Sequence, residues 1–458
     1  MEKAPADALR RAVAVETTPQ VAPRAPREHS LQEVYATVSV SRSPWYWRRL
    51  LGFLGPGFLI SVGYMDPGNW ATDIAGGARF GYTLLFVIML SNLMAVLLQS
   101  LSLKLGVATE RDLAQMCREN YGRTASFLLW IGAEIAIAAC DLAEVIGSAI
   151  ALNLLFHIPL FYGVLITGTD VLLILLLQRW GFRYVEALVI TLIGTILALF
   201  VVQMVLSRPD YWSALTSLVV PSPAILTNGE MLYIAIGILG ATVMPHNLYL
   251  HSSIVQSRQY ERTVEGKREA IHMANVDSAL ALTLALFVNA AILVMAAAVF
   301  HRSGHYDVAA IEDAYKLLSP LVGAAGASTL FAIALLASGQ NSSITGTLAG
   351  QVVMEGFLQM KVAPWLRRMI TRGLAIVPTI IVVALMGQRG TDKLLILSQV
   401  ILSLQLSFAV VPLVMFTGSK AKMGEFANGR WLQGLAWVTT VLIVALNVWM
   451  LVLMAKGS

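Results

Sequence analysis

The stretch GYMDPGNWATD, residues 63–73, decides how this chain folds. Residues 55–65 are apolar, and apolar sequence resumes at Leu84, so the DPGN at 66–69 lies at membrane depth. A proline removes a main-chain donor, and the residue before it avoids helical geometry. Unpaired main chain is costly in hydrocarbon, so such a break persists only beside a cavity or a ligand.

Composition places the chain among membrane proteins. Of its 458 residues, 57% are hydrophobic and only 13% are charged, whereas soluble proteins carry about 25% charged residues. Its two cysteines, Cys117 and Cys140, form no C-x-x-C pair, which argues against a disulfide framework or a thiolate metal site. We predict an all-α integral membrane protein, with a disordered cytoplasmic tail at 1–43 and a transmembrane domain at 44–458.

A membrane-length window predicts eleven transmembrane helices. They lie near 51–77, 82–106, 124–152, 159–178, 184–206, 231–256, 274–300, 324–352, 369–387, 391–416 and 432–455. With this assignment, 25 of the 32 Lys and Arg residues lie on the side of the N-terminus. The positive-inside rule then predicts a cytoplasmic N-terminus and an external C-terminus. The net positive charge is explained by topology, so no nucleic-acid partner is implied.

A second break occurs in the sixth predicted helix, within GATVMPHNLYLHS at 240–252. The two breaks begin two five-helix sets, about 50–207 and 230–416, followed by an extra helix at 432–455. The sets start on opposite sides of the membrane, which is an inverted repeat in topology. Paired interrupted helices in corresponding positions indicate the substrate site of a secondary transporter. Simple proline kinks are the alternative, but they would not require polar residues at both breaks.

The residues at the breaks favour a cation. Helix C-terminal carbonyls and the Asp66 carboxylate supply negative charge, and Asn69 offers an amide oxygen. Met244 offers a thioether, which suits softer transition metals, although its position alone is equally compatible with packing. His246 lies one turn from its break and titrates near neutrality, so we predict a proton relay there. His251 is better explained as a packed histidine.

Several motifs resemble the Nramp family of divalent-metal transporters: DPGN in the first span, MPHNLYLHS in the sixth, and the flanking GPG, GGARFGY and LLASGQNSS. The similarity runs from about residue 50 to the end. It implies a LeuT-like fold of ten core helices plus one, and proton-coupled import of Mn²⁺ or Fe²⁺, with Cd²⁺ also favoured by the thioether. The ligands that it implies are Asp66, Asn69, Met244 and the carbonyl of Ala241, joined in some states by the carbonyl of Gly63 and by Gln399.

A second group of polar residues lies in the third predicted span. Glu134, Asp141 and Glu144 are spaced to share one stripe of a helix, and three carboxylates at bilayer depth imply a hydrated or paired path. The Nramp resemblance makes this stripe a proton route, with Arg367 and Arg368 beside its cytoplasmic exit. The positive-inside rule alone would also explain these arginines, and a structural hydrogen-bond cluster would also explain the carboxylates.

The leading interpretation is therefore a proton–metal symporter in a bacterial inner membrane, with metal ions, protons and the lipid bilayer as its partners. One alternative is a sodium-coupled carrier of a small organic solute on the same fold. Another is a membrane metal sensor or receptor that transports nothing. The sequence contains no P-loop, H-E-x-x-H or G-x-S-x-G motif, so we expect neither an enzyme nor a bound cofactor.

Overall fold

The computed structural model describes residues 29–41, 43–168, 180–308, 310–359, 364–386 and 388–456. The first half contains α1 (Tyr46–Phe53), α2 (Pro56–Gly63), α3 (Pro67–Phe80), α4 (Leu85–Thr109), α5 (Leu113–Asn120), α6 (Arg123–Phe156), α7 (Leu160–Thr167), α9 (Phe182–Ser207), α10 (Tyr211–Val219) and α11 (Ala224–Thr227). The second half contains α12 (Gly229–Thr242), α13 (Pro245–Ile254), η1 (Val255–Ser257), α14 (Val264–Ala296), η2 (Ala297–His301), α15 (Ile311–Val322), α16 (Ala327–Leu358), α17 (Pro364–Met386), α18 (Gln388–Gly418), α19 (Lys420–Met423), η3 (Gly424–Phe426) and α20 (Arg430–Lys456).

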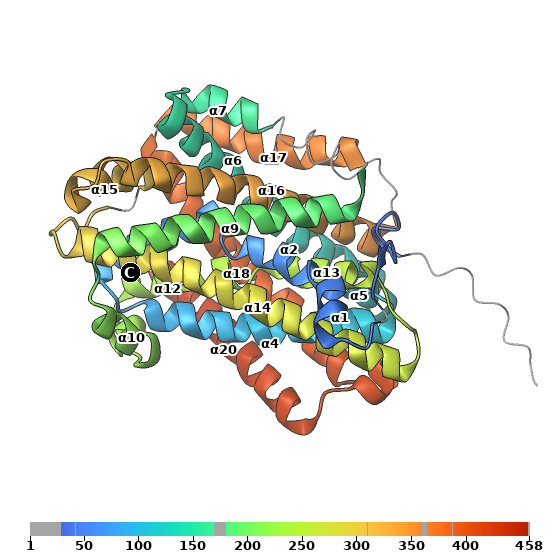
Figure 1. Ribbon diagram of the computed structural model, residues 1–458. Coiled ribbons are helices and arrows are strands. Elements are labelled where there is room, and N and C mark those ends of the chain that lie inside the picture. Colours follow the sequence, from blue (N-terminus) through green and yellow to red (C-terminus); the bar gives the residue numbers. More distant parts are fainter. Residues whose placement is uncertain are drawn as a thin grey trace, which may run out of the picture.

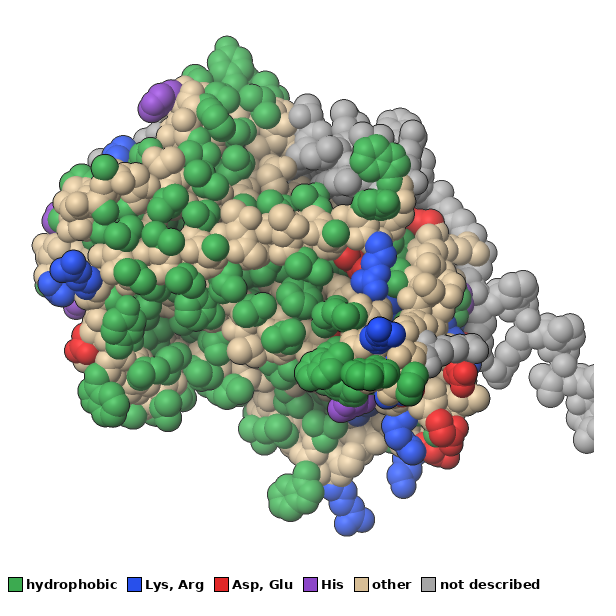
Figure 2. All heavy atoms as spheres, viewed as in Figure 1, with side chains coloured by type: hydrophobic (Ala, Val, Ile, Leu, Met, Phe, Trp, Pro, Cys, Tyr) green, Lys and Arg blue, Asp and Glu red, His purple; other side chains and the backbone are tan. Residues whose placement is uncertain are grey.

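The long helices run along a common direction and form one bundle (Figure 1). Helix α14 packs against α2, α3, α4 and α9, while α6 packs against α16 and α18. Hydrophobic side chains cover the middle of the face in Figure 2, and charged side chains gather toward its ends. This is the surface expected of a bundle that crosses a bilayer.

Seven helical segments of the described chain are long and apolar enough to cross a membrane. They are Leu85–Thr109, Arg123–Phe156, Phe182–Ser207, Gly229–Ser257, Val264–His301, Lys393–Gly418 and Arg430–Val452. The predicted first span is divided between α2 and α3. Helices α16 and α17, with 32 and 23 residues, are also long enough to cross the membrane. The fourth predicted span falls partly on 169–179, outside the described residues, so the count of eleven stays a prediction.

Both predicted helix breaks are present. The first separates α2 from α3 at residues 64–66, and the second separates α12 from α13 at residues 243–244. Pro67 and Pro245 each occupy the first turn of the helix that follows, where a missing N–H costs nothing. Asp66 caps α3 by accepting a hydrogen bond from the Asn69 main-chain N–H at 2.8 Å.

The start of α2 is anchored by buried charges from three other segments. Asp277 of α14 accepts hydrogen bonds from the N–H groups of Gly55 and Gly57, at 3.2 and 2.6 Å. Arg258, fully buried, pairs with Glu186 of α9 at 2.7 Å and donates to the Leu54 carbonyl at 2.8 Å. These contacts fix the point where the chain enters the first broken helix.

The N-terminal segment differs from the tail predicted at 1–43. Leu31, Val34 and Val38 are buried, and β1 (Val38–Ser39) pairs in parallel with β2 (Arg258–Gln259). These three apolar side chains are spaced to face the protein, a signal that the charged and proline-rich composition upstream obscured. In the described chain, ordered packing therefore begins before residue 43.

Candidate metal site

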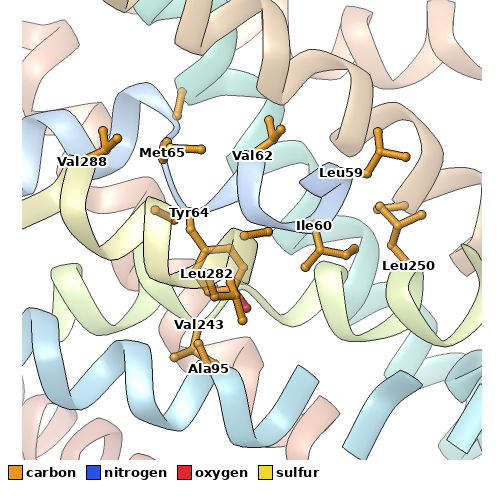
Figure 3. Packing of buried hydrophobic residues seen from close by; sticks show 14 of the residues in the cluster. Leu59, Ile60, Val62, Tyr64, Met65, Ala95, Val243, Leu250, Leu282 and Val288 are labelled. Atoms are coloured by element: carbon orange, nitrogen blue, oxygen red, sulfur yellow. The ribbon is translucent and has the colours of Figure 1, made fainter. Parts of the chain in front are cut away.

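Main-chain carbonyls of the first break are mostly satisfied by neighbouring helices. The Tyr64 carbonyl accepts from the Asn289 amide of α14 at 2.7 Å. The Met65 carbonyl accepts from the Trp70 indole at 3.2 Å and from the Ser338 hydroxyl of α16. Figure 3 shows Tyr64 and Met65 within the apolar core around α2. Satisfied carbonyls allow the break to persist in an apolar setting.

Asp66 and Asn69 are fully buried at this break. Asp66 Oδ1 accepts two hydrogen bonds from Asn69, one from its N–H at 2.8 Å and one from its side-chain Nδ2 at 2.7 Å. Asp66 Oδ2 has no hydrogen-bond partner among the described residues. A buried carboxylate oxygen without a donor is expensive unless it takes a proton or a cation.

The Asn69 amide nitrogen joins the two breaks. Besides Asp66, Nδ2 donates to the Gly63 carbonyl at 3.4 Å and to the Ala241 carbonyl of α12 at 3.1 Å. Three oxygens of the ligand set that the sequence predicted therefore surround one weakly positive group. The Asn69 Oδ1 atom accepts from Asn289 Nδ2 at 3.3 Å, which keeps the amide in this orientation.

Met244 lies close to Gly63 at the first break. It is fully buried at the start of α13, next to Ala136, Cys140 and Leu402. A Cβ built on Gly63 would lie 3.1 Å from the Met244 sulfur and would overlap the Asn247 amide. Gly63 therefore lets the thioether approach the first break closely, which is why glycine rather than alanine suits this position.

Gln399 of α18 covers both breaks. A Cβ at Gly68 would overlap the Gln399 side-chain amide, and a Cβ at Gly240 would overlap its main-chain carbonyl oxygen. The Gln399 Nε2 atom donates to Ser398 at 3.0 Å, while Oε1 has no partner in the described part of the chain. The side-chain oxygen is thus left as a possible ligand.

The six residues of the predicted ligand set come together around the breaks from α2, α3, α12, α13 and α18. Across the described residues, no three His, Cys, Asp or Glu side chains gather as a metal site. A cation at the breaks would therefore be held by one carboxylate, neutral oxygens and a thioether. That donor set is intermediate in softness and matches first-row transition metals better than Mg²⁺ or Ca²⁺.

The two histidines of α13 have different surroundings. His246 is buried, and neither ring nitrogen has a hydrogen-bond partner among the described residues. His251 Nδ1 lies 2.9 Å from Gln99 Oε1, and Gln99 donates to the Tyr64 hydroxyl at 2.8 Å. His251 is thus held in a hydrogen-bonded chain, whereas the His246 ring nitrogens have no hydrogen-bond partner in the described residues.

Two of the three predicted carboxylates of the polar stripe converge. A Cβ on Gly346 of α16 would lie 3.0 Å from Asp141 Oδ1 and 3.1 Å from Glu144 Oε1. Glu134 lies further along α6, half-buried, and accepts from the Trp130 indole at 3.0 Å. Arg367 and Arg368 belong to α17, but their side chains lie outside the described residues.

Sequence reasoning missed two parts of this site. Asn289 ties the Tyr64 carbonyl to the Asn69 amide, and Gly346 faces the paired carboxylates. A lone asparagine in the apolar run ALFVNAAILV was the available signal for Asn289. Gly346 gave no signal, because glycine is common in membrane helices.

Comparison with known proteins agrees with this geometry. A family model described as natural resistance-associated macrophage protein-like matches residues 57–453, most of the chain. The chain belongs to the Nramp family. Two curated Nramp relatives carry the name "Divalent metal cation transporter MntH". The one from Nostoc sp. is 61% identical over 422 residues, 92% of this chain and 95% of the relative. The one from Listeria monocytogenes is 59% identical over 436 residues, 95% of this chain and 97% of the relative.

Solved structures support the same assignment. The Eremococcus coleocola manganese transporter, crystallised with an aromatic bis-isothiourea substituted compound, is 44% identical with a TM-score of 0.86, covering 94% of this chain and 91% of that one. Mhp1, a nucleobase-cation-symport-1 family transporter, has a TM-score of 0.59 at 14% identity, over 88% and 92% of the two chains, and shows the LeuT-like fold alone. This Nramp protein is a multi-pass membrane protein of a transporter family, not an enzyme.

Proposed function

We propose that this Nramp protein imports divalent transition metal ions, Mn²⁺ or Fe²⁺, in symport with protons by alternating access. One observation carries the proposal. The Gly63 and Ala241 carbonyls and the Asp66 carboxylate meet at a single point between two broken helices, beside the Met244 sulfur. The names of the relatives, divalent metal cation and manganese transporters, support the same substrate class.

Metal binding is expected to require a turn of the Asn69 amide. In the structure, Nδ2 stands where a cation would meet the three oxygens. Rotation by half a turn about the terminal side-chain bond would exchange nitrogen for Oδ1, and the same residue would then be a ligand. Met244 and the Gln399 side-chain oxygen complete the proposed set. Cd²⁺ should be carried as well, because it is softer than Mn²⁺.

Protons are proposed to leave the metal site along the carboxylates of α6. Asp66 loses its proton when a cation binds, since one carboxylate cannot serve both. His246, with no competing partner in the described chain, is a proposed relay. Asp141 and Glu144, which face Gly346 together, and Glu134 further along α6 continue the proposed route toward Arg367 and Arg368.

The proposed orientation places the N-terminus in the cytoplasm of a bacterial inner membrane and the C-terminus outside. The excess of Lys and Arg on the N-terminal side supports it. The end of the bundle that carries α1, α5 and the N-terminal segment is then the cytoplasmic end.

The test is uptake of Mn²⁺ by proteoliposomes, with and without an inward proton gradient. Asp66→Ala should abolish uptake, because it removes the carboxylate of the proposed ligand set. The matched control is Asp210→Ala, which removes another helix-capping aspartate, at the exposed start of α10. Wild-type uptake by the Asp66 variant, or equal loss in both variants, would refute the site.

A further inference from the structure

A groove of about 790 Å³ lies on the flank of the bundle, apart from the metal site. Its lining residues are Tyr121, just before α6, and residues of α6, α18 and α20, and both α6 and α20 pack on α18. The lining is almost entirely apolar, with Leu128, Phe408 and Val444 among its side chains. Leu128 and Phe408 are 62% and 61% exposed, so the groove opens toward lipid.

Small residues hollow the groove out. Ala125 and Gly132 are seven residues apart, two helical turns, and therefore line the same face of α6. A Cβ on Gly132 would meet nothing nearer than Gln405 Cγ at 3.7 Å, so space remains above this glycine. On α18, Pro412 adds a compact side chain to the same depression.

The length of the groove matches one lipid leaflet. The lining begins at Tyr121, two residues before α6, and continues on α6 to Gly132; from its start at Arg123, α6 rises about 14 Å to Gly132. The hydrocarbon core of a bilayer is about 30 Å thick, so each leaflet contributes about 15 Å. An acyl chain lying along α6 would thus fill the groove from the interface to the middle of the membrane.

Positive charge surrounds the interfacial end of the groove. The Tyr121 ring at this end lies 5.7 Å from the Phe416 ring, and the Lys422 ammonium lies 5.3 Å from the Phe416 centroid. Arg123 begins α6 two residues after Tyr121, and Lys420 begins α19. Arg123, Lys420 and Lys422 are exposed, and none of them forms an ion pair with a described carboxylate.

Neighbouring acids do not cancel this charge. Glu119 pairs with Arg111 at 3.2 Å, and Glu425 lies 3.8 Å from Arg268. These two carboxylates are each paired with an arginine. Arg123, Lys420 and Lys422 have no carboxylate partner among the described residues, and Lys422 donates to the neutral Asn120 side chain, so their charge is available to a lipid headgroup.

We propose that the groove binds an anionic glycerophospholipid. One acyl chain would lie between α6 and α20 against α18, and the phosphate would contact Lys422, Arg123 and Lys420. The apolar lining of the groove would accept the acyl chain of any lipid, but the cations without an ion pair at its mouth select a negative headgroup. This proposal is independent of the metal substrate.

The test is native mass spectrometry of purified protein with an equimolar mixture of phosphatidylglycerol and phosphatidylcholine that carry the same chains. Wild type should retain phosphatidylglycerol preferentially. Lys422→Gln and Arg123→Gln should each reduce the preference by about fivefold, the effect expected for one basic residue near an anionic lipid. The matched control is Lys393→Gln, an exposed lysine near the opposite end of α18.

A groove-filling variant separates this site from general lipid contact. Gly132→Leu should abolish retention of phosphatidylglycerol with an unchanged melting temperature, because the added side chain enters open space. Glycerol phosphate without acyl chains should not compete. Equal retention of both lipids by wild type, or an unchanged preference in the Lys422, Arg123 and Gly132 variants, would overturn the proposal. Loss of the phosphatidylglycerol preference on dimer formation would assign the groove to a second copy of the chain instead.

Discussion

Gln399 contacts both broken helices at once, with its side-chain amide over Gly68 of α3 and its main-chain carbonyl oxygen against Gly240 of α12. One residue of α18 thus lies at the point where the two interrupted helices approach each other. The two glycines permit this in different ways. Gly68 makes room for the end of a flexible side chain, whereas Gly240 makes room for main chain, which cannot turn aside.

Substitution of these glycines should therefore have unequal effects. Gly240→Ala should abolish uptake and lower the melting temperature, because its Cβ would force α12 and α18 apart. Gly68→Ala should retain the fold and lose only part of the uptake, since Gln399 can rotate away. Gly194→Ala on α9, where no atom lies within 4 Å, is the control. Equal activity of the Gly240 and Gly194 variants would show that the close approach is not needed.

Met244→Ala should change selectivity more than affinity for Mn²⁺. A thioether ligand adds little binding affinity for Ca²⁺ or Mg²⁺, which prefer oxygen ligands, and adds most for Cd²⁺. In the variant, Ca²⁺ and Mg²⁺ should compete better against Mn²⁺ uptake, and competition by Cd²⁺ should weaken most. The measurement is competition by each ion against Mn²⁺ uptake. An unchanged rank order would mean that Met244 only packs against Ala136 and Leu402.

Gly346→Ala should separate proton coupling from metal binding. Its methyl group would lie 3.0 and 3.1 Å from carboxylate oxygens of Asp141 and Glu144, which would crowd the pair without touching the breaks. Metal binding measured by calorimetry should stay near wild type, while uptake driven by a pH gradient should fall. Asp141→Asn and His246→Ala should behave alike. Wild-type proton flux in all three variants would place the relay elsewhere.

Arg258→Ala should destabilise the protein strongly. Removing Arg258 leaves the buried Glu186 carboxylate with only the half-exposed Arg183 as an ion-pair partner among the described residues, at a cost of about 3–5 kcal/mol. Arg268→Ala is the control, because its contact with Glu425 at 3.8 Å is exposed and worth about 1 kcal/mol or less. Unfolding by denaturant in detergent measures both.

A second substitution tests the cause of that loss. Adding Glu186→Leu to the Arg258 variant should recover part of the stability, since the buried Glu186 carboxylate is then gone. If the double variant is no more stable than Arg258→Ala, the loss comes instead from the hydrogen bonds that Arg258 donates to the Phe53 and Leu54 carbonyls.

The sequence predicted both helix breaks and the residues that gather around them, because prolines, glycines and acids at membrane depth have few structural explanations. Asp66, Asn69 and Met244 could be named for this reason. Their mutual arrangement could not, since it depends on how α3 and α12 meet. The donation from Asn69 to the Ala241 carbonyl joins residues 172 positions apart, and no local pattern encodes it.

Elements near the ends of the bundle were harder to predict. The burial of Leu31 and Val34 depends on contacts with distant segments, such as the hydrogen bond from the Leu31 N–H to Glu355 at 2.9 Å. Glu134 was placed on one stripe with Asp141 by helical spacing alone. Spacing fixes the direction of a side chain but not the neighbours that it meets, and so it did not reveal that Asp141 and Glu144 face Gly346.

The Asn69 amide also bears on the half of the proposed cycle in which nothing is carried. A symporter must return to its starting orientation without its substrates. In the absence of a cation, the buried oxygens of Gly63, Asp66 and Ala241 would repel one another. The two amide hydrogens weaken that repulsion, and a proton on Asp66 would remove its charge. We therefore expect the Asn69 amide to take the place of the cation while the proposed carrier returns without metal.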